Sequence, residues 1–292
     1  MFQFLFYPEG KIRQSGEWGR WLELCRELSE AGVSVHSMEP GGGSQELQKR
    51  MDADGISAED SLMLASTQQE LLWAEELHMA VVGYGQNDAG ELWNAPVLLL
   101  GLGGAGYSFF HRSYQRFHRI PWTILETQRC MVRELGLEDI DALFELYRKP
   151  HVTDYMEPLY PYEEELAYQE KYISQIYHYY GYGMWLVWDK SGTRLMGRAG
   201  VEQRNEGEDT RLELGYVLAP EYWHQGYAAE VCRAILAWAE ENLEFDFVEA
   251  LVHPDNTASI RLLECLGFCC QGQLQRDGSR HLHYRRKLDG QS

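Results

Sequence analysis

The chain has 292 residues, of which 45% are hydrophobic and 24% charged, which predicts an ordered globular protein long enough for two domains. Its formal net charge of −19 argues against a general nucleic-acid-binding protein, which needs a basic surface. No stretch is apolar enough to span a membrane, and the six cysteines show neither CxxC spacing nor a secreted disulfide framework. We expect a cytoplasmic protein with reduced thiols and no signal peptide, because residues 1–7 lack a basic lead and a cleavage site.

Residues 1–125 alternate between short apolar runs and amphipathic segments. Strands are predicted at 2–7, 33–38, 62–65, 80–84 and 97–100, and helices at 17–31 and 68–78. Such β–α alternation predicts a mostly parallel sheet with helices on both faces. Residues 126–292 are expected to form a second domain.

The order of these elements resembles the haloacid-dehalogenase-like (HAD) fold with little or no cap. In that family the first strand ends in Asp-x-Asp-Gly-Thr, where this chain has Tyr7-Pro8-Glu9-Gly10-Lys11. Ser37 fits the family's Ser or Thr at the end of the second strand. The magnesium-binding run Gly-Asp-Ser-x-x-Asp is replaced by Leu64-Ala65-Ser66-Thr67-Gln68-Gln69.

These departures bear on chemistry, because phosphoryl transfer in this family needs a carboxylate nucleophile and hard oxygen ligands for Mg²⁺. Tyr7, Ala65 and Gln69 provide neither. The resemblance therefore implies a HAD-like module without catalytic carboxylates, kept for binding or scaffolding. A flavodoxin-like or other α/β domain is the alternative.

A glycine-rich run, Gly101-Leu102-Gly103-Gly104-Ala105-Gly106, follows a predicted strand as a nucleotide-binding fingerprint does. No acidic residue follows on a further strand about twenty positions later, where the chain has residues 116–121. We therefore interpret the run as a flexible interstrand loop. Residues 107–119 mix aromatic and basic side chains and form either an interaction helix or packing between the domains.

The most informative segment is 212–239, a predicted strand that breaks at Pro220, turns at Gly226 and enters an amphipathic helix. Gly226 and Ala228 let the backbone approach a ligand, and the helix start presents unpaired N–H groups at the positive end of the dipole. This arrangement suits a pyrophosphate. A buried strand is then predicted at 247–252, and residues 253–256 can cap a helix at 257–266 that Gly267 ends.

With these segments in place, the chain resembles the GNAT superfamily of acyl-CoA-dependent N-acetyltransferases over about residues 126–288. Within it, the branch of ribosomal-protein N-terminal acetyltransferases is the most similar. The matching motifs are Glu126-Thr127-Gln128-Arg129-Cys130-Met131-Val132-Arg133, Glu213-Leu214-Gly215-Tyr216, Tyr222-Trp223-His224-Gln225-Gly226-Tyr227-Ala228-Ala229-Glu230, Pro254-Asp255-Asn256-Thr257-Ala258-Ser259 and Leu266-Gly267-Phe268. The resemblance implies an α+β domain with a splayed mixed central sheet, and acetyl-CoA as acyl donor.

The resemblance also implies which residues hold the donor. The backbone of residues 214–219 would pair with the pantetheine arm as an added strand, and Asn256 would bond the arm from the far side of the splay. An ordinary helix cap is the alternative for Asn256. The expected cofactor-binding residues are Tyr216, Val217, Leu218, Gln225, Gly226, Tyr227, Ala228, Ala229 and Asn256.

Catalysis requires a neutral amine. A lysine amine has a pKa of about 10.4 and an α-amine one near 8, so a strong base is essential only for the first. Glu213 matches a family position for a base acting through water; a solvated or salt-bridged residue, with Arg211 and Arg198 available, is the alternative. His253 is the second candidate base, or else a turn-capping or surface histidine.

The acid that many family members use, a tyrosine that protonates the departing thiolate, is replaced by Leu263. Ser259 is expected to assist through its hydroxyl or a bound water, with helix packing or backbone bonding as the alternative. This weak acid–base equipment favours an α-amine or another acceptor of low pKa.

Acceptor choice in the family is set by the segment between the first two helices, here residues 153–165. Tyr155, Glu157, Tyr160 and Tyr162 interleave rings and carboxylates, which suits a cation. In the following helix we expect Tyr168, Tyr172 and Ile176 to be core residues and residues 163–165 to form a first turn that favours the dipole. His281 and His283 share a strand face without a third ligand, so no metal site is expected.

We therefore expect an α/β protein whose second domain transfers acetyl from acetyl-CoA to an amine by direct attack in a ternary complex. The acceptor is a small molecule or peptide, and cationic if the negative charge serves steering rather than solubility. No nucleic-acid or membrane partner is expected, and the protein is a monomer or homodimer. The alternative is a non-enzymatic acyl-CoA-binding or regulatory protein with a pseudo-phosphatase scaffold domain.

Overall fold

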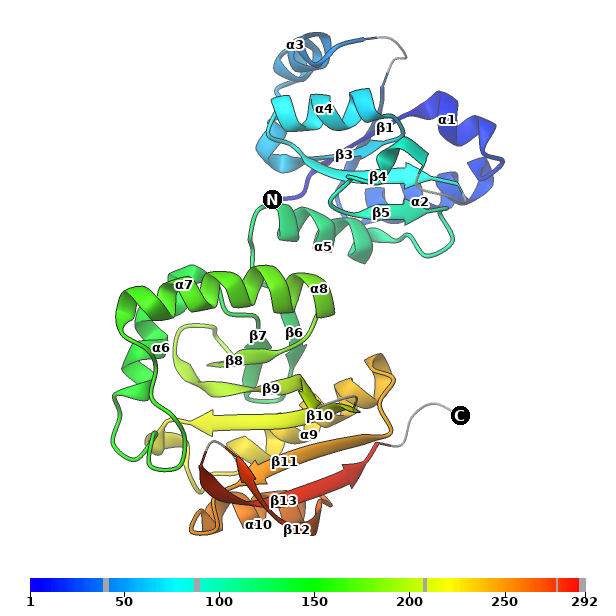
Figure 1. The fold of residues 1–292 in the computed structure, drawn as a ribbon. Coiled ribbons are helices and arrows are strands. Elements are labelled where there is room, and N and C mark those ends of the chain that lie inside the picture. Colours follow the sequence, from blue (N-terminus) through cyan, green and yellow to red (C-terminus); the bar gives the residue numbers. More distant parts are fainter. Residues whose placement is uncertain (39–41, 87–89, 207–208, 277, 289–292) are drawn as a thin grey trace. The chain divides into compact units, whose positions relative to one another are not determined.

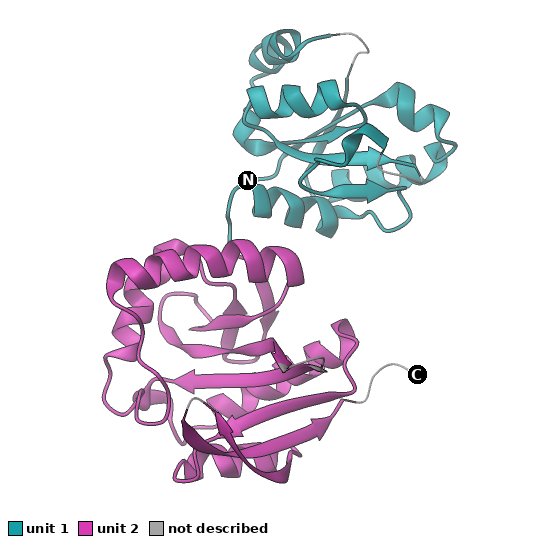
Figure 2. Cartoon of the chain, viewed as in Figure 1, with its two compact units in different colours: residues 1–120 teal, residues 121–292 magenta. Residues whose placement is uncertain are grey.

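The computed structural model describes residues 1–38, 42–86, 90–206, 209–276 and 278–288. The chain divides into two compact units, residues 1–120 and 121–292, coloured separately in Figure 2. The boundary predicted between residues 125 and 126 lies inside a strand, β6 (Thr123–Glu126), which pairs with β7 (Cys130–Arg133) of the second unit. The predicted boundary is therefore too late, because the hydrogen bonds of β6 tie it to the second sheet.

The first unit is built on a five-stranded parallel sheet of order β2-β1-β3-β4-β5 (Figure 1). Its strands are β1 (Phe4–Tyr7), β2 (Ser34–Ser37), β3 (Ser61–Ala65), β4 (Ala80–Gly85) and β5 (Leu98–Leu100). Its helices are α1 (Glu9–Gln14), α2 (Trp18–Glu30), α3 (Ser44–Asp54), α4 (Gln68–Glu76) and α5 (Tyr107–Phe117). The predicted parallel sheet is confirmed, and its strand order is the doubly wound order of flavodoxin-like folds.

Two cores flank this sheet. Successive side chains of a strand point to opposite faces, so Leu5 packs with α2 and α5 whereas Phe6 packs with α3 and α4. The helices α1 and α3 are absent from the sequence prediction. In α3 the described buried residues are only Leu47 and Met51, which gives too weak a period to identify a helix.

The glycine-rich run connects β5 to α5, so its interpretation as an interstrand loop is wrong. Glu17 Oε1 accepts a hydrogen bond from the N–H of Leu102 at 2.7 Å, and Glu27 Oε1 accepts one from the N–H of Tyr107 at 2.7 Å. Carboxylates of the protein itself therefore occupy donors that a nucleotide phosphate would need. This contact supports the sequence argument against a nucleotide site.

The second unit has an eight-stranded mixed sheet of order β12-β13-β11-β10-β9-β8-β7-β6. Its further strands are β8 (Met184–Asp189), β9 (Leu195–Glu206), β10 (Asp209–Leu218), β11 (Phe247–Val252), β12 (Cys269–Arg276) and β13 (Ser279–Lys287). Its helices are α6 (Ile140–Tyr147), α7 (Tyr162–Tyr172), α8 (His178–Tyr180), α9 (Tyr227–Asn242) and α10 (Thr257–Cys265). Among the strand pairs that the described residues form in this sheet, only β10 and β11 run parallel.

The helices divide between the two faces of this sheet. On one face α9 packs through Trp238 against Trp185, edge to face, with ring centroids 5.0 Å apart. On the other face the Tyr172 hydroxyl at the end of α7 donates to Glu202 of β9 at 2.5 Å. The burial pattern of β10 follows from helices covering both faces of the sheet. Leu212 and Leu214 point to one face and are buried, and the residues that alternate with them point to the other face.

A π-helical turn, Ile173–Tyr177, joins α7 to α8. The turn brings two tyrosines five positions apart to one residue: the Tyr172 hydroxyl accepts from the N–H of Met184 at 2.7 Å, and the Tyr177 hydroxyl donates to its C=O at 2.5 Å. Tyr172 is 6% exposed and Tyr168 44%, so the core prediction for this helix is confirmed only in part. No helix of the described residues combines the length and apolar character needed to cross a membrane.

Candidate functional site

A gap opens between the parallel strands β10 and β11. Their paired positions are Leu212 with Val248 and Glu213 with Glu249, although the strands continue to Leu218 and Val252 (Figure 1). On its other edge β10 pairs with β9 along its whole length. Beyond Glu213, β10 therefore has main-chain groups on the side of β11 that do not pair with either neighbouring strand among the described residues. An extended ligand that contains amide groups can form hydrogen bonds with these main-chain groups.

Three of the predicted cofactor-binding residues, Tyr216, Val217 and Leu218, lie on the part of β10 beside the gap, where Val217 is on the side that pairs with β9. The Tyr216 side chain spans the gap, because its hydroxyl donates to the C=O of Ser259 in α10 at 3.3 Å. Burial raises the pKa of Tyr216 well above its usual range, so the hydroxyl keeps its proton. The Tyr216 side chain therefore connects β10 to α10.

The turn after β10 presents free donors at the start of α9. Gly226 is the N-cap residue with φ of 81°, a left-handed conformation that favours glycine, and no described side chain caps the helix. The N–H groups of Tyr227, Ala228 and Ala229 lie in the first turn and have no partner within the helix. Unpartnered N–H groups at a helix start can bind an anion. The side chain of Gln225 donates to the C=O of Glu221 at 2.6 Å.

A contact that the sequence did not indicate reaches the same turn. The Nη1 of Arg129, a residue just before β7, donates to the C=O of Gln225 at 3.1 Å. Arg129 belongs to a matching motif, but no periodicity or spacing links two residues so far apart in the chain.

Asn256 stands on the far side of the gap. Its Oδ1 accepts a hydrogen bond from the N–H of Ser259 at 3.1 Å, so Asn256 is the helix cap of α10, which was the alternative to a donor contact. Its Nδ2 donates to no described residue, so the cap and a bond to the donor are compatible. The hydroxyl of Ser259 likewise makes no hydrogen bond within the described part of the chain.

Glu213 is in an ion pair. Its Oε2 lies 2.5 Å from Nη1 of Arg276 at the end of β12. The salt-bridged state is therefore present, with a partner other than the two arginines that the sequence suggested. Arg211 lies 3.4 Å from Glu249, and Arg198 lies 5.7 Å from the ring centre of Tyr172.

Three glutamates lie directly opposite one another where the gap begins: Glu202 of β9, Glu213 of β10 and Glu249 of β11. Like charges in this arrangement destabilise a sheet unless they are compensated. At Glu202 the compensation comes from the Tyr172 hydroxyl at 2.5 Å and from Arg204 at 2.6 Å. The glutamate row is therefore a set of paired charges.

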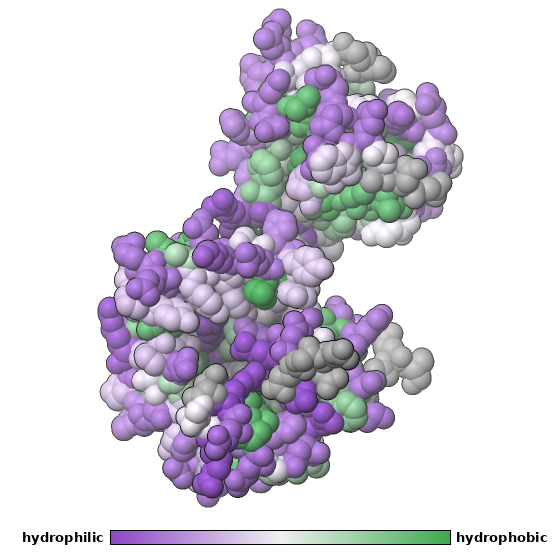
Figure 3. Space-filling model, in the orientation of Figure 1, coloured by the Kyte–Doolittle hydropathy of each residue, from purple (hydrophilic) through white to green (hydrophobic). Residues whose placement is uncertain are grey.

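Glu249 is the most buried member of the row, at 6% exposed. Burial opposes its charge, but hydrogen bonding from Arg285 at 2.6 Å and the charges of His283 and Arg211 outweigh burial, and the pKa of Glu249 lies below its usual value. Hydrophilic residues dominate the visible surface of the second unit in Figure 3.

Tyr155 of the predicted acceptor segment lies against His253, a candidate base, just after the carboxyl end of β11. The Tyr155 ring stacks on His253 with centroids 5.3 Å apart, and its hydroxyl donates to the C=O of Asp255 at 3.4 Å. His253 Nδ1 accepts from the N–H of Asp255 at 3.2 Å, so only Nε2 is left for a base. The turn-capping alternative for His253 is therefore present in the structure.

The other predicted acceptor residues are not brought to this point. The Tyr162 hydroxyl donates to Asp141 at 2.9 Å in α6, and the Tyr160 ring packs on Tyr168 at 5.7 Å. Glu157 is exposed. Leu263, at the position of the missing tyrosine acid, is buried.

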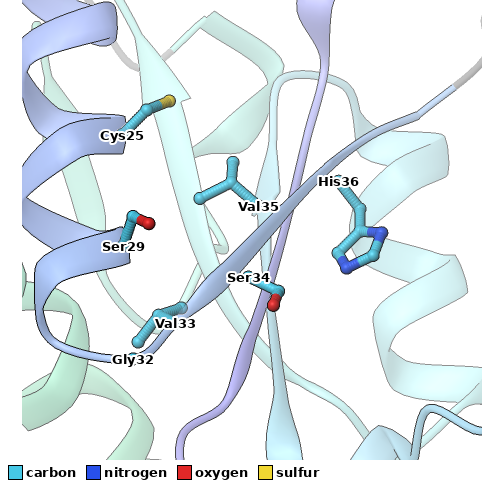
Figure 4. Close-up of a pocket in the computed structure, with 7 residues that line it drawn as sticks. All are labelled: Cys25, Ser29, Gly32, Val33, Ser34, Val35 and His36. Atoms are coloured by element: carbon cyan, nitrogen blue, oxygen red, sulfur yellow. The ribbon is translucent and has the colours of Figure 1, made fainter.

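Two further places in the molecule bear on ligand binding. His283 Nε2 lies 3.0 Å from Glu249, and the described residues contain no group of three or more His, Cys, Asp or Glu arranged to hold a metal ion. In the first unit a cavity of about 480 Å³ opens beside the edge strand β2 (Figure 4). It is lined by Cys25, Ser29, Gly32, Val33, Ser34, Val35 and His36.

About half of the chain is similar to known proteins. Residues 129–269 match the model of the acetyltransferase (GNAT) domain family. The chain is 29% identical over 153 residues to "Uncharacterized N-acetyltransferase p20" of Bacillus licheniformis, covering 52% of this chain and 85% of that protein. It is 29% identical over 154 residues to "Uncharacterized N-acetyltransferase YoaA" of Bacillus subtilis (strain 168), covering 52% and 86%.

A solved structure of RimL, described as a ribosomal L7/L12 alpha-N-protein acetyltransferase in complex with coenzyme A, has the same fold. Its TM-score is 0.50 at 18% identity, covering 58% of this chain and all of that one. The family match includes the free edge of β10, the start of α9 and Asn256. The second unit therefore contains an acetyltransferase (GNAT) domain, and the protein is an acetyltransferase whose acyl donor is acetyl-CoA.

Proposed function

We propose that this acetyltransferase binds acetyl-CoA in the gap between β10 and β11 and transfers its acetyl group to an amine by direct attack in a ternary complex. The observation that supports this proposal is that β10 stops pairing with β11 after Glu213, and that the chain then continues from β10 to the uncapped start of α9. The free edge of β10 fits the pantetheine arm, and the N–H groups of residues 227–229 fit the pyrophosphate.

In the reaction the amine nitrogen bonds to the acetyl carbon, the carbon–sulfur bond breaks, and the amine gives up a proton while the thiolate gains one. Glu213 stands at the last paired position before the gap and its side chain is 22% exposed, so a water on its carboxylate can take the amine proton. Nε2 of His253 is the second candidate for this task. The free hydroxyl of Ser259 can assist proton return to sulfur.

The acceptor we propose is a peptide or small-molecule amine of low pKa, such as an α-amine, approaching past Tyr155. Neutralising an α-amine at pH 7 costs about 1–1.5 kcal/mol, against about 4–5 kcal/mol for a lysine amine. A site whose predicted base is ion-paired and whose tyrosine acid is replaced by Leu263 suits the easier acceptor. A ribosomal-type N-terminal acetyltransferase would use this chemistry.

The test is release of free thiol from acetyl-CoA by the purified protein, with and without amines. The panel contains peptides with a free α-amine, the same peptides with that amine blocked, polyamines and aminoglycosides. We expect thiol release that requires an amine and is largest with the free α-amine. Binding of acetyl-CoA without amine-dependent turnover across the panel would contradict transfer to an amine.

We also infer that the first unit is a HAD-like module without phosphatase chemistry. At the end of β1, where that family has its nucleophile, the Tyr7 ring packs on Trp21 with centroids 4.5 Å apart. Ala65, at the end of β3, is buried and has no carboxylate. Magnesium-dependent hydrolysis of a phosphate ester by the whole protein would overturn this inference, whereas the strand order alone also fits a flavodoxin-like domain.

A further inference from the structure

Arg129 connects the loop before β7 to the first turn of α9 through four contacts. Its main-chain N–H donates to Oε1 of Glu230 at 2.9 Å, and its Nε donates to Oε2 of the same residue at 2.6 Å. Its Nη1 donates to the C=O of Gln225 at 3.1 Å, and its guanidinium lies over the Tyr227 ring, 3.9 Å from the centroid. The guanidinium is therefore held in one orientation at the start of the helix.

These contacts leave guanidinium donors of Arg129 unused close to the start of α9. A guanidinium has five N–H donors, of which these contacts use one on Nε and one on Nη1. A Cβ built on Gly226, the N-cap residue, would lie 3.7 Å from Nη2 of Arg129, so Nη2 lies close to the residue at which α9 begins. The Arg129 side chain is 38% exposed, which leaves it open to a ligand.

The charge of Arg129 also matters because Glu230 lies in the same first turn. A carboxylate there suits the helix dipole but repels an anionic ligand. Burial opposes the charge of Glu230, but hydrogen bonds with Thr127 and Arg129 outweigh burial, and its pKa lies below its usual value. Glu230 is therefore ionised at neutral pH, and the positive charge of Arg129 offsets its repulsion of an anion bound beside it.

We propose that Arg129 is a phosphate-binding residue of this acetyltransferase. Its Nη2 and its remaining Nη1 hydrogen donate to the pyrophosphate of the acyl donor, while Glu230, Tyr227 and the C=O of Gln225 fix the guanidinium. A planar guanidinium suits phosphate oxygens because it donates two parallel hydrogen bonds. The inference rests on the donor site proposed above.

The first test replaces Arg129 with methionine, which keeps an unbranched stem but removes the donors and the charge. Calorimetric titration with CoA should show affinity falling about tenfold to a hundredfold, as expected for loss of charge-assisted hydrogen bonds. 3′-Dephospho-CoA, which keeps the pyrophosphate, should lose affinity by the same factor. A loss confined to CoA would overturn the pyrophosphate assignment, because it would place Arg129 at the 3′-phosphate.

A second test separates phosphate binding from neutralisation of Glu230. In the double variant Arg129→Met/Glu230→Gln the carboxylate that needs compensation is gone. If Arg129 binds the phosphate itself, CoA affinity stays low in the double variant and depends less on salt than in the unmodified protein. Recovery of affinity in the double variant would overturn the proposal, because Arg129 would then act only on Glu230.

A matched control is available in the first unit. Arg13 also donates through Nε to a glutamate, Glu9 at 2.7 Å, and lies over an aromatic ring, Trp18 at 3.7 Å. Arg13→Met should leave CoA affinity unchanged. If Arg129→Met fails to fold, Arg129→Lys keeps the charge but loses the planar fork, and its CoA affinity should still fall. If the unmodified protein binds no CoA, the donor site itself fails, whatever Arg129 does.

Discussion

Glu213 and Arg276 form an ion pair of 2.5 Å although their strands, β10 and β12, are separated in the sheet by β11 and β13. Arg276 is the last residue of β12, and Glu213 is the last residue of β10 that pairs with β11. The hairpin of β12 and β13 therefore contacts the predicted base where the gap between β10 and β11 begins. This relationship leads to two predictions.

Glu213→Gln should lower kcat/KM about a hundredfold near pH 6, within the range for general base catalysis. The loss should shrink towards pH 9, because the free amine then no longer needs a base. The measurement is the pH profile of kcat/KM with the best amine of the panel. A loss of equal size at every pH would argue that Glu213 has a structural role instead.

Arg276→Met should lower kcat/KM about fivefold to tenfold, because the ion pair that holds the Glu213 carboxylate at the start of the gap is lost. The measurement is kcat/KM with the same amine at one pH. Arg280→Met is the control, because Arg280 is exposed and opposes Gln275 in the same hairpin. An unchanged kcat/KM in Arg276→Met would show that this ion pair does not position the base.

Gly226→Val should abolish measurable CoA binding. Its φ of 81° disfavours any side chain, and the new atoms would enter the space between the helix start and Arg129. Gly267→Val is a matched control for strain, since φ is 83° and no atom lies within 4 Å of a built Cβ. The control should lose about 1–2 kcal/mol of stability and keep its CoA affinity; equal loss of affinity in both variants would contradict the site.

Glu249→Gln should destabilise the second unit by about 2 kcal/mol at pH 7, because the carboxylate accepts charged hydrogen bonds at a buried position. The pKa of Glu249 is lowered in the folded state, so its stabilisation is present above the ordinary value of about 4.3 and is lost as pH falls through the folded value. Urea unfolding at pH 7 and pH 4 measures this. A difference that does not shrink at pH 4 would contradict the assignment.

Tyr155→Ala should raise the KM for a cationic acceptor about fivefold to tenfold with little change in kcat, since it removes a ring that a cation can contact. Tyr155→Phe should retain most of the affinity. Tyr179→Ala is the control, because Tyr179 is 81% exposed on α8 and packs on Tyr180. The hypothesis fails if Tyr155→Ala leaves the KM unchanged.

Local patterns in the sequence were sufficient for the elements that form the site. The strand predicted at 247–252 coincides with β11 (Phe247–Val252), and the helix predicted at 257–266 ends one residue after α10 (Thr257–Cys265). An apolar run, an asparagine cap and a terminating glycine are all read within a few residues of where they act. The motif order then predicted the acetyltransferase domain that the family match shows.

The sequence alone determined this domain, its donor and the alternation that buries Leu212 and Leu214. Only the tertiary structure decided the partners of the charged side chains: Arg129 meets Glu230 across 101 residues, and Arg276 meets Glu213 across 63. The physical reason is that a side-chain period is a local property of one helix or strand. The pairing of long, charged side chains depends instead on how strands that are distant in the sequence twist and separate within the sheet. No local sequence pattern contains that information.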